Sequence, residues 1–208
     1  MLRPLIAAVL LTSWASAQSG AGLDAPWRQL FNGKDLSGWT EVGAERWVVE
    51  DGAIYGEGVT DEYGYLATEE EYSDFHLSLR FKCEASGNSG VYFHTAFAPG
   101  TATVTAGRQV EIDRRIGGHT GGVYGDGRGW LAWPAPELET VIRPDGWNDL
   151  LIKVEGRRYV TYLNGVKMLD YTNPSQEATS GVIALQLHSG GEGRMRFRDL
   201  WVRDLQPR

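Results

Sequence analysis

The stretch FHLSLRFKC, residues 75–83, decides the fold class because its apolar and polar residues alternate throughout. A period of two places the apolar side chains on one face of an extended strand, whereas an amphipathic helix repeats about every 3.6 residues. We therefore predict a half-buried β-strand whose apolar face includes Cys83, the only cysteine of the chain, packed as a small core residue. The opposite face carries His76, Ser78, Arg80 and Lys82.

Six further stretches share this alternation and are separated by glycine-rich segments. They span residues 90–95, 108–112, 148–156, 158–165, 181–189 and 194–205. Glycine-rich segments are typical of turns, and the pair Asn164-Gly165 favours a type I′ hairpin turn. Because the pattern contains many short strands and no long amphipathic helix, the sequence predicts an all-β sandwich or barrel.

The first 17 residues have the layout of a secretory signal peptide. Arg3 precedes an apolar run at residues 5–11, and small residues lead up to Ala17. We expect cleavage after Ala17, a short segment at residues 18–26, a single domain at residues 27–206, and export to the periplasm or the extracellular space. A buried N-terminal helix is the alternative interpretation, since the apolar run is too short for a permanent membrane span.

The charge of the chain argues against polyanionic partners. Lys and Arg number 20 and Asp and Glu number 27, which gives a net charge of −7 at pH 7. A protein of this sign is repelled by nucleic acid and by anionic lipid, so we expect neither as a partner. After the leader, no segment is apolar enough to cross a membrane. The sequence leaves the oligomeric state open.

Four of the predicted strands offer a polar face with hydrogen-bonding or ionisable groups. These faces carry Arg80, Tyr92, His94, Gln109, Glu111, Asp113, Gln186 and His188. If they lie side by side, they form one ligand-binding surface, with Tyr124, Trp130 and Trp133 at its rim. Aromatic platforms beside polar groups suit a sugar, which has apolar ring faces and a hydroxyl edge. The alternative is an ordinary solvated face of an antiparallel sheet.

Metal binding and surface pairing are open alternatives for single residues. Glu111 and Asp113 have arginines beside them that would form ordinary surface ion pairs, and His188 at a strand end suits a surface turn equally well. The four histidines show no short His-x-His or His-x₃-His spacing, so the pattern does not favour zinc. A divalent cation such as calcium, held by aspartate and backbone carbonyls in a glycine-rich loop, stays open.

Several motifs occur together in a recognisable order. They are LFNGKDLSGW (30–39), NSGVYFHT (88–95), QVEID (109–113), TGGVYGDGRGWL (120–131), GWNDLLIKVEGRRYVTYLNGVKMLDYT (146–172) and GVIALQLHSGGEGRMRFRDLWVRDL (181–205). In this combination the chain resembles the 3-keto-disaccharide hydrolase domain family, over about residues 27–206. The resemblance implies a concanavalin A-like jelly-roll sandwich of two antiparallel sheets, and activity on glycosides oxidised at C3 of a sugar ring.

The chemistry of such a substrate defines the groups that the site needs. A ketone at C3 acidifies the C2 proton, a base removes it, the oxygen on C1 leaves by β-elimination, and water adds back for net hydrolysis. The catalytic candidates are Glu111, Asp113 and His188. Either Glu111 or His188 is the base, and Asp113 orients His188 or ligates a cation. Arg80, Tyr124 or a bound divalent cation stabilises the C3 oxyanion. The candidates for substrate binding are Arg80, Tyr92, His94, Tyr124, Arg128, Trp130 and Gln186.

Three other functions compete with this one. A retaining glycosidase of the laminarinase type would use a Glu-x-Asp-x-x-Glu motif, but Ile116 stands where the second glutamate belongs. A non-catalytic carbohydrate-binding module or lectin needs only the polar face and the aromatic residues. A secreted structural or interaction domain needs neither. We rank the keto-glycoside hydrolase first and the binding module second.

Overall fold

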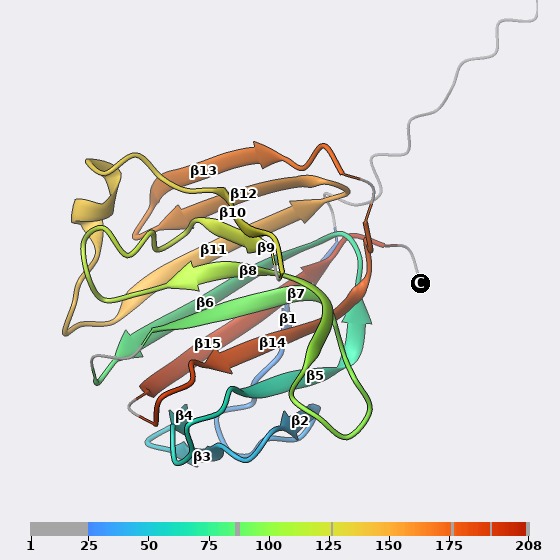
Figure 1. Ribbon diagram of the computed structural model, residues 1–208, viewed down its shortest axis with the longest axis vertical. Helices are drawn as coiled ribbons and strands as arrows, with labels where there is room; N and C mark the ends of the chain where they lie inside the picture. The colour runs from blue at the N-terminus through green and yellow to red at the C-terminus, as the bar shows by residue number, and fades with distance from the viewer. Residues whose placement is uncertain (1–24, 86–87, 126, 176, 192, 207–208) are drawn as a thin grey trace, which may run out of the picture.

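The computed structural model describes residues 25–85, 88–125, 127–175, 177–191 and 193–206, so the predicted signal peptide lies outside the described residues. Two antiparallel sheets pack face to face (Figure 1). The all-β sandwich predicted from the alternation is confirmed. Among the described residues, no helix has the length and apolar character to cross a membrane.

The first sheet, sheet A, contains the strand from which the fold was predicted. Its order is β13 (Val166–Thr172), β12 (Arg158–Leu163), β11 (Asn148–Glu155), β6 (Phe75–Cys83), β15 (Arg194–Asp204), β4 (Ala53–Glu57) and β3 (Arg46–Glu50), and β1 (Arg28–Gln29) also pairs with β15. The stretch 75–83 is β6, in the middle of this sheet. The β12–β13 hairpin turns at Asn164-Gly165 with positive φ at both residues, as the predicted type I′ turn requires.

The second sheet, sheet B, positions the candidate site. Its order is β10 (Gly129–Ala132), β9 (Val123–Gly125), β8 (Val104–Ile112), β7 (Ser89–Phe97), β14 (Gly181–Leu187), β5 (Gly64–Tyr72) and β2 (Trp39–Val42). A short 3₁₀ helix, η1 (Leu138–Val141), lies in the connection between β10 and β11.

The core lies between the two sheets and follows from the alternation. Leu77, Leu79 and Phe81 of β6 and Val91 and Phe93 of β7 are fully buried in one apolar cluster. Cys83 belongs to the same cluster, which confirms its predicted role as a small core residue. Because alternate residues point to opposite faces of a strand, the residues between these core positions in β7, β8 and β14 lie on the outer face of sheet B.

Candidate carbohydrate-active site

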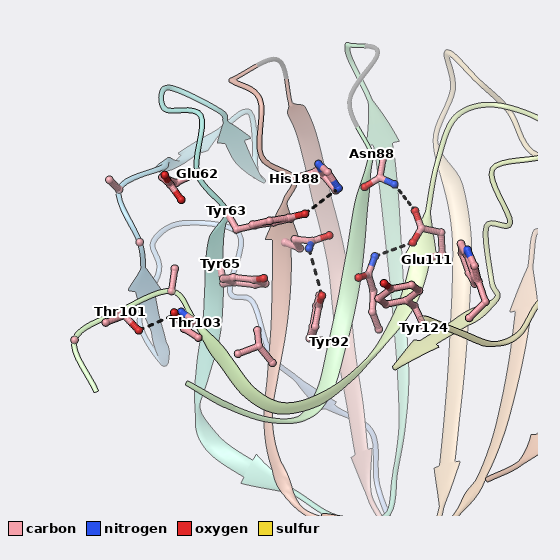
Figure 2. Close-up of a pocket in the computed structure, with 18 residues that line it drawn as sticks. Glu62, Tyr63, Tyr65, Asn88, Tyr92, Thr101, Thr103, Glu111, Tyr124 and His188 are labelled. Carbon is pink, nitrogen blue, oxygen red and sulfur yellow. Dashed lines mark hydrogen bonds between the residues drawn. The ribbon is translucent and has the colours of Figure 1, made fainter. Parts of the chain in front are cut away.

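A cavity of about 900 Å³ lies over the outer face of sheet B (Figure 2). Its floor is built by alternate residues of four strands, Tyr65 of β5, Tyr92 of β7, Gln109 and Glu111 of β8, and Gln186 of β14. One wall comes from Glu62, Tyr63 and the turn at residues 100–104, and the opposite wall from Tyr124 and Trp130. His188, just after β14, also lines the cavity. The sequence pattern therefore places six of its candidate residues around one space.

Glu111 is a buried carboxyl at the centre of this site. Its side chain accepts a hydrogen bond at Oε1 from Nδ2 of Asn88 (2.6 Å) and one at Oε2 from Nε2 of Gln109 (2.8 Å). Glu111 as a whole is only 4% exposed. Burial, with a further contribution from the negative charge of Asp113, raises the pKa of Glu111 to about 9. At neutral pH Glu111 therefore holds a proton and is suited to act as an acid.

The surroundings of Glu111 can accommodate that proton. Oδ1 of Asn88 is buried and has no hydrogen-bond partner among the described residues. A half-turn of the Asn88 amide would exchange its donor for this acceptor, so the protonated carboxyl also finds a partner. Gly90 matters here because it lies beside Glu111 in the β7–β8 register. A Cβ atom on residue 90 would come within 2.5 Å of Cγ and Nε2 of Gln109. Only glycine leaves room for Gln109 to reach Glu111.

Gln186 belongs to the floor of the cavity and has an amide oxygen without a partner among the described residues. It is 2% exposed, and its Nε2 lies 3.5 Å from the Tyr92 hydroxyl. Its Oε1 is buried without a hydrogen-bond partner among the described residues. A buried polar atom that lacks a partner costs free energy unless something else binds it. Because this oxygen is shielded from solvent, a ligand hydroxyl can supply the partner once the Gln186 amide turns toward the cavity.

His188 faces Tyr63 across one end of the cavity (Figure 2). The Tyr63 hydroxyl lies 3.3 Å from Nε2 of His188, and the two rings meet edge to face with centroids 4.9 Å apart. Tyr63 ends a loop that a buried carboxylate holds in place. Glu45 accepts hydrogen bonds from the backbone N–H groups of Val59 and Thr60 and from the Thr60 hydroxyl. This end of the site is therefore preorganised.

Register separates Glu111 and His188 across the floor of the same cavity. Gln186 pairs with Gly90, and Gly90 pairs with Glu111, so β14 and β8 are two strand spacings apart. That separation is about 10 Å. His188 follows two residues after Gln186 and lies further along the same strand direction. Asn88 lies between the two groups and contacts Glu111 (Figure 2), so a sugar ring that reaches both the carboxyl and the imidazole would lie over Asn88.

Arg80 and Asp113 lie away from the cavity. The expectation that Arg80 shares the polar face is wrong, because β6 belongs to sheet A and Arg80 instead forms ion pairs with Asp149 and Asp199. Asp113 is buried just after β8 ends, and its carboxylate accepts hydrogen bonds from the backbone and guanidinium of Arg115. Asp113 thus contacts neither His188 nor the cavity lining, and acts on Glu111 through its charge.

His94 and Arg128 also lie outside the cavity lining. His94 has a positive φ, and the register of β7 with β8 shifts between Phe93 and Ala96. This irregularity breaks the alternation, and the buried His94 ring reaches the carbonyl of Ser73 (Nε2 to O, 2.8 Å). Arg128 is half exposed and forms an ion pair with Glu177. Neither residue therefore faces the cavity in which we expected it.

Asn88, Tyr63 and Tyr65 are among the lining residues that the sequence analysis missed. Asn88 precedes β7 by one residue and shares the parity of Gly90 and Tyr92, so the alternation could have been extended to it. Tyr63 and Tyr65 flank Gly64 at the start of β5, where the glycine and the run of glutamates at residues 69–71 hid the strand pattern.

A metal ion bound by protein needs several donor side chains close together. No three His, Cys, Asp or Glu side chains among the described residues gather closely enough to hold a metal ion. Glu62, Glu111 and His188 all line the cavity, but they are spread along it. The lining thus does not fit a divalent cation bound by protein side chains alone.

Comparison with known proteins identifies the family. The model of the 3-keto-alpha-glucoside-1,2-lyase-like domain matches residues 26–203. The chain belongs to this family. The resemblance inferred from the sequence motifs is thereby confirmed, and membership supports a carbohydrate-active function for this chain.

A curated relative and two solved structures extend the comparison. A 3-keto-disaccharide hydrolase of Bacteroides thetaiotaomicron is 31% identical over 74 residues, which is 31% of this chain and 26% of the relative. The match thus spans about a quarter of that relative. A candidate glycosyl hydrolase from Parabacteroides distasonis superimposes with a TM-score of 0.67 at 23% identity, covering 86% of this chain and 94% of the other. Carbohydrate binding module CBM66 from Bacillus subtilis gives 0.61 at 16% identity, covering 80% and 96%. These two likenesses show the fold, a jelly-roll β-sandwich.

Proposed function

We propose that this protein cleaves glycosides that carry a ketone at C3, by elimination across C1 and C2 followed by addition of water. The observation that carries the proposal is the pairing of opposite chemical roles across one cavity. Glu111 is buried and protonated at neutral pH, whereas His188 lies on the other side with its Nε2 facing the space. An elimination needs one group that takes a proton and another that gives one.

In the proposed mechanism His188 is the base. Its Nε2 takes the C2 proton, and the electrons of the C2–H bond move onto the C3 oxygen as an enolate. The Tyr63 hydroxyl, which faces His188 in the resting protein, turns to the C3 oxygen and stabilises its charge. The Gln186 amide turns its unpartnered Oε1 toward the cavity and accepts a hydrogen bond from a ring hydroxyl.

Glu111 completes the elimination as the acid. The enolate re-forms the ketone, the C1–O bond breaks, and the leaving oxygen takes the proton of Glu111. The resulting carboxylate then removes a proton from water as the water adds to C1 of the enone, and the imidazolium returns its proton to C2. Both residues finish in their starting states, and the products are the 3-keto sugar and the free alcohol.

The family comparison and the residue set both favour this mechanism over a two-carboxylate glycosidase. The description of the matched family, a 3-keto-alpha-glucoside-1,2-lyase-like domain, names a lyase that acts on keto-glucosides. A two-carboxylate mechanism would need a second acid opposite Glu111. The other carboxylate of the lining, Glu62, is exposed at the far wall, beyond Tyr63 (Figure 2).

Incubation with paired substrates tests the proposal. Purified protein is given a 3-keto-glucoside or its unoxidised parent, each with and without EDTA. We expect cleavage of the oxidised glycoside alone, unaffected by EDTA. Cleavage of the unoxidised parent would favour a glycosidase, and binding without cleavage of either would favour a lectin-like module. Loss of activity in EDTA would indicate that a bound cation, and not Tyr63, stabilises the oxyanion.

A further inference from the structure

A cluster of aromatic side chains begins at the cavity lining near Glu111 and continues outside it. We call it the aromatic wall, and it consists of Tyr124, Trp130, His119 and Trp133. Tyr124 packs edge to face on Trp130 (centroids 5.5 Å apart), and His119 packs edge to face on the same ring (4.9 Å). Trp133 continues the wall, 5.7 Å from His119. Trp130 and Trp133 are 37% and 53% exposed. The wall therefore offers wide apolar ring faces to solvent.

A buried carboxylate holds the wall in place. Glu139 of η1 accepts hydrogen bonds from the backbone N–H groups of Gly117 (2.6 Å) and His119 (3.1 Å), and its Oε1 lies 3.0 Å from Nδ1 of His119. A buried carboxylate is costly unless it is well hydrogen-bonded. Here those bonds fix the ring of His119 between Trp130 and Trp133. The exposed rings are thus preorganised, which a merely solvated surface does not need.

The size of the cavity leaves room for more than one ring. Its volume of about 900 Å³ is near the upper end of the range for drug-sized ligands, about 300–1,000 Å³. In the proposed mechanism the oxidised ring lies between His188 and Glu111, and Glu111 protonates the leaving oxygen. The leaving group must then extend past Glu111. Tyr124 lines the cavity on that side (Figure 2), and Trp130, which also lines the cavity, packs against Tyr124.

We propose that the aromatic wall is the subsite for the leaving group, and that it selects leaving groups with a flat apolar face, such as a second sugar ring or an aryl ring. This inference rests on the proposed function. Sugar and aryl rings stack on indole faces, whereas a methyl group is too small to reach from Glu111 to Trp133. Trp130 is the nearer platform and Trp133 the farther one.

A series of 3-keto-glucosides tests the subsite. The oxidised ring is kept constant, and the leaving group is methanol, glucose or 4-nitrophenol. The variants are Trp130→Ala, Trp133→Ala and Glu139→Gln, and Trp201→Ala serves as the matched control because Trp201 is 39% exposed on sheet A. We expect the two wall variants to lower kcat/KM about tenfold for the ring-bearing substrates, the loss of roughly one stacking contact. Activity on the methyl glycoside stays within about twofold.

Two results would overturn the subsite. Equal losses on all three substrates would mean that the wall supports the fold or the oxidised ring, and no loss on any substrate would mean that it contacts none of them. Glu139→Gln acts by positioning, so it should reproduce the selective loss in milder form while leaving the methyl glycoside unaffected.

Failure of the proposed function remains distinguishable from failure of the subsite. If the unaltered protein cleaves none of the glycosides, dissociation constants for the same three ligands are measured by calorimetry. Tighter binding of the ring-bearing ligands that is lost in Trp130→Ala supports the subsite on a protein that only binds. Equal affinities for all three ligands overturn it.

Discussion

Nδ2 of Asn88 lies 2.6 Å from Oε1 of Glu111, and this contact joins the residue just before β7 to β8 in the cavity lining. Together with the Gln109 contact, it encloses a carboxyl whose pKa burial raises to about 9. The proton held there is the feature on which the proposed chemistry depends, and it has consequences for stability as well as for activity.

The first consequence is a pH-dependent cost to folding. The pKa of Glu111 is about 9 in the folded protein against a usual 4.5, so the folded state binds this proton more tightly. This site favours folding most below about pH 4.5, and the favourable contribution is lost progressively as pH rises toward about 9. The neutral amide in Glu111→Gln removes the titration. The free energy of unfolding of the unaltered protein should therefore fall, relative to that of Glu111→Gln, as pH rises from 6 to 8. The difference between the two proteins changes by on the order of 1 kcal/mol per pH unit at most. Urea unfolding at both pH values measures this, and identical changes in the two proteins would contradict the raised pKa.

The second prediction concerns the alkaline limb of activity. Protonation of the leaving oxygen needs the acid form of Glu111, so kcat/KM for a 3-keto-glucoside should fall as pH rises through about 9. Exchange of the C2 proton with solvent needs only the base and should not show this limb. A limb shared by cleavage and exchange would assign it to another group.

Tyr63 gives a third prediction. Tyr63→Phe keeps the ring packed against His188 but removes the hydroxyl proposed to stabilise the C3 oxyanion. Loss of such a donor lowers kcat by about 100-fold, with KM little changed. Steady-state kinetics on a 3-keto-glucoside measures it, with Thr103→Ala, another exposed residue of the lining, as the control. Unchanged kcat in Tyr63→Phe would remove Tyr63 from the mechanism.

Gly90 provides a fourth prediction because its position is sterically required. The Cβ atom in Gly90→Ala would lie within 2.5 Å of Gln109, so Gln109 must leave Glu111. We expect a loss of about 1–3 kcal/mol in the free energy of unfolding and a large fall in kcat. Gly193→Ala is the matched control, since a Cβ atom there meets its nearest neighbour at an ordinary 3.5 Å. Full activity of Gly90→Ala would show that the Gln109 contact is dispensable.

The sequence predicted the strands of the fold better than it predicted which side chains meet in the site. The alternation located β6 and the cores of β7, β8 and β14, because a period of two is a local property of the chain. The same alternation shows which side chains share a face of one strand but not which sheet the strand joins. That is why Arg80 was placed with residues of the other sheet.

Departures from regular strand geometry explain the remaining differences. The positive φ at His94 turns its ring out of the predicted face. Because β8 ends at Ile112, Asp113 lies outside the strand and does not share the face on which Glu111 lies. Tyr63 reaches the site through a loop held by Glu45, a contact between segments that no short pattern encodes. Glu111, Gln186 and His188 were predictable because regular strands, or their immediate ends, carry them.

The measurement that tests the central claim most directly is exchange of the C2 proton in D₂O. The unaltered protein, Glu111→Gln and His188→Ala are each incubated with a 3-keto-glucoside, and deuterium at C2 and free alcohol are followed by NMR. If His188 is the base and Glu111 the acid, Glu111→Gln incorporates deuterium into uncleaved substrate and releases little alcohol, whereas His188→Ala does neither. Exchange that persists in His188→Ala and disappears in Glu111→Gln would contradict the account, because it would make Glu111 the base.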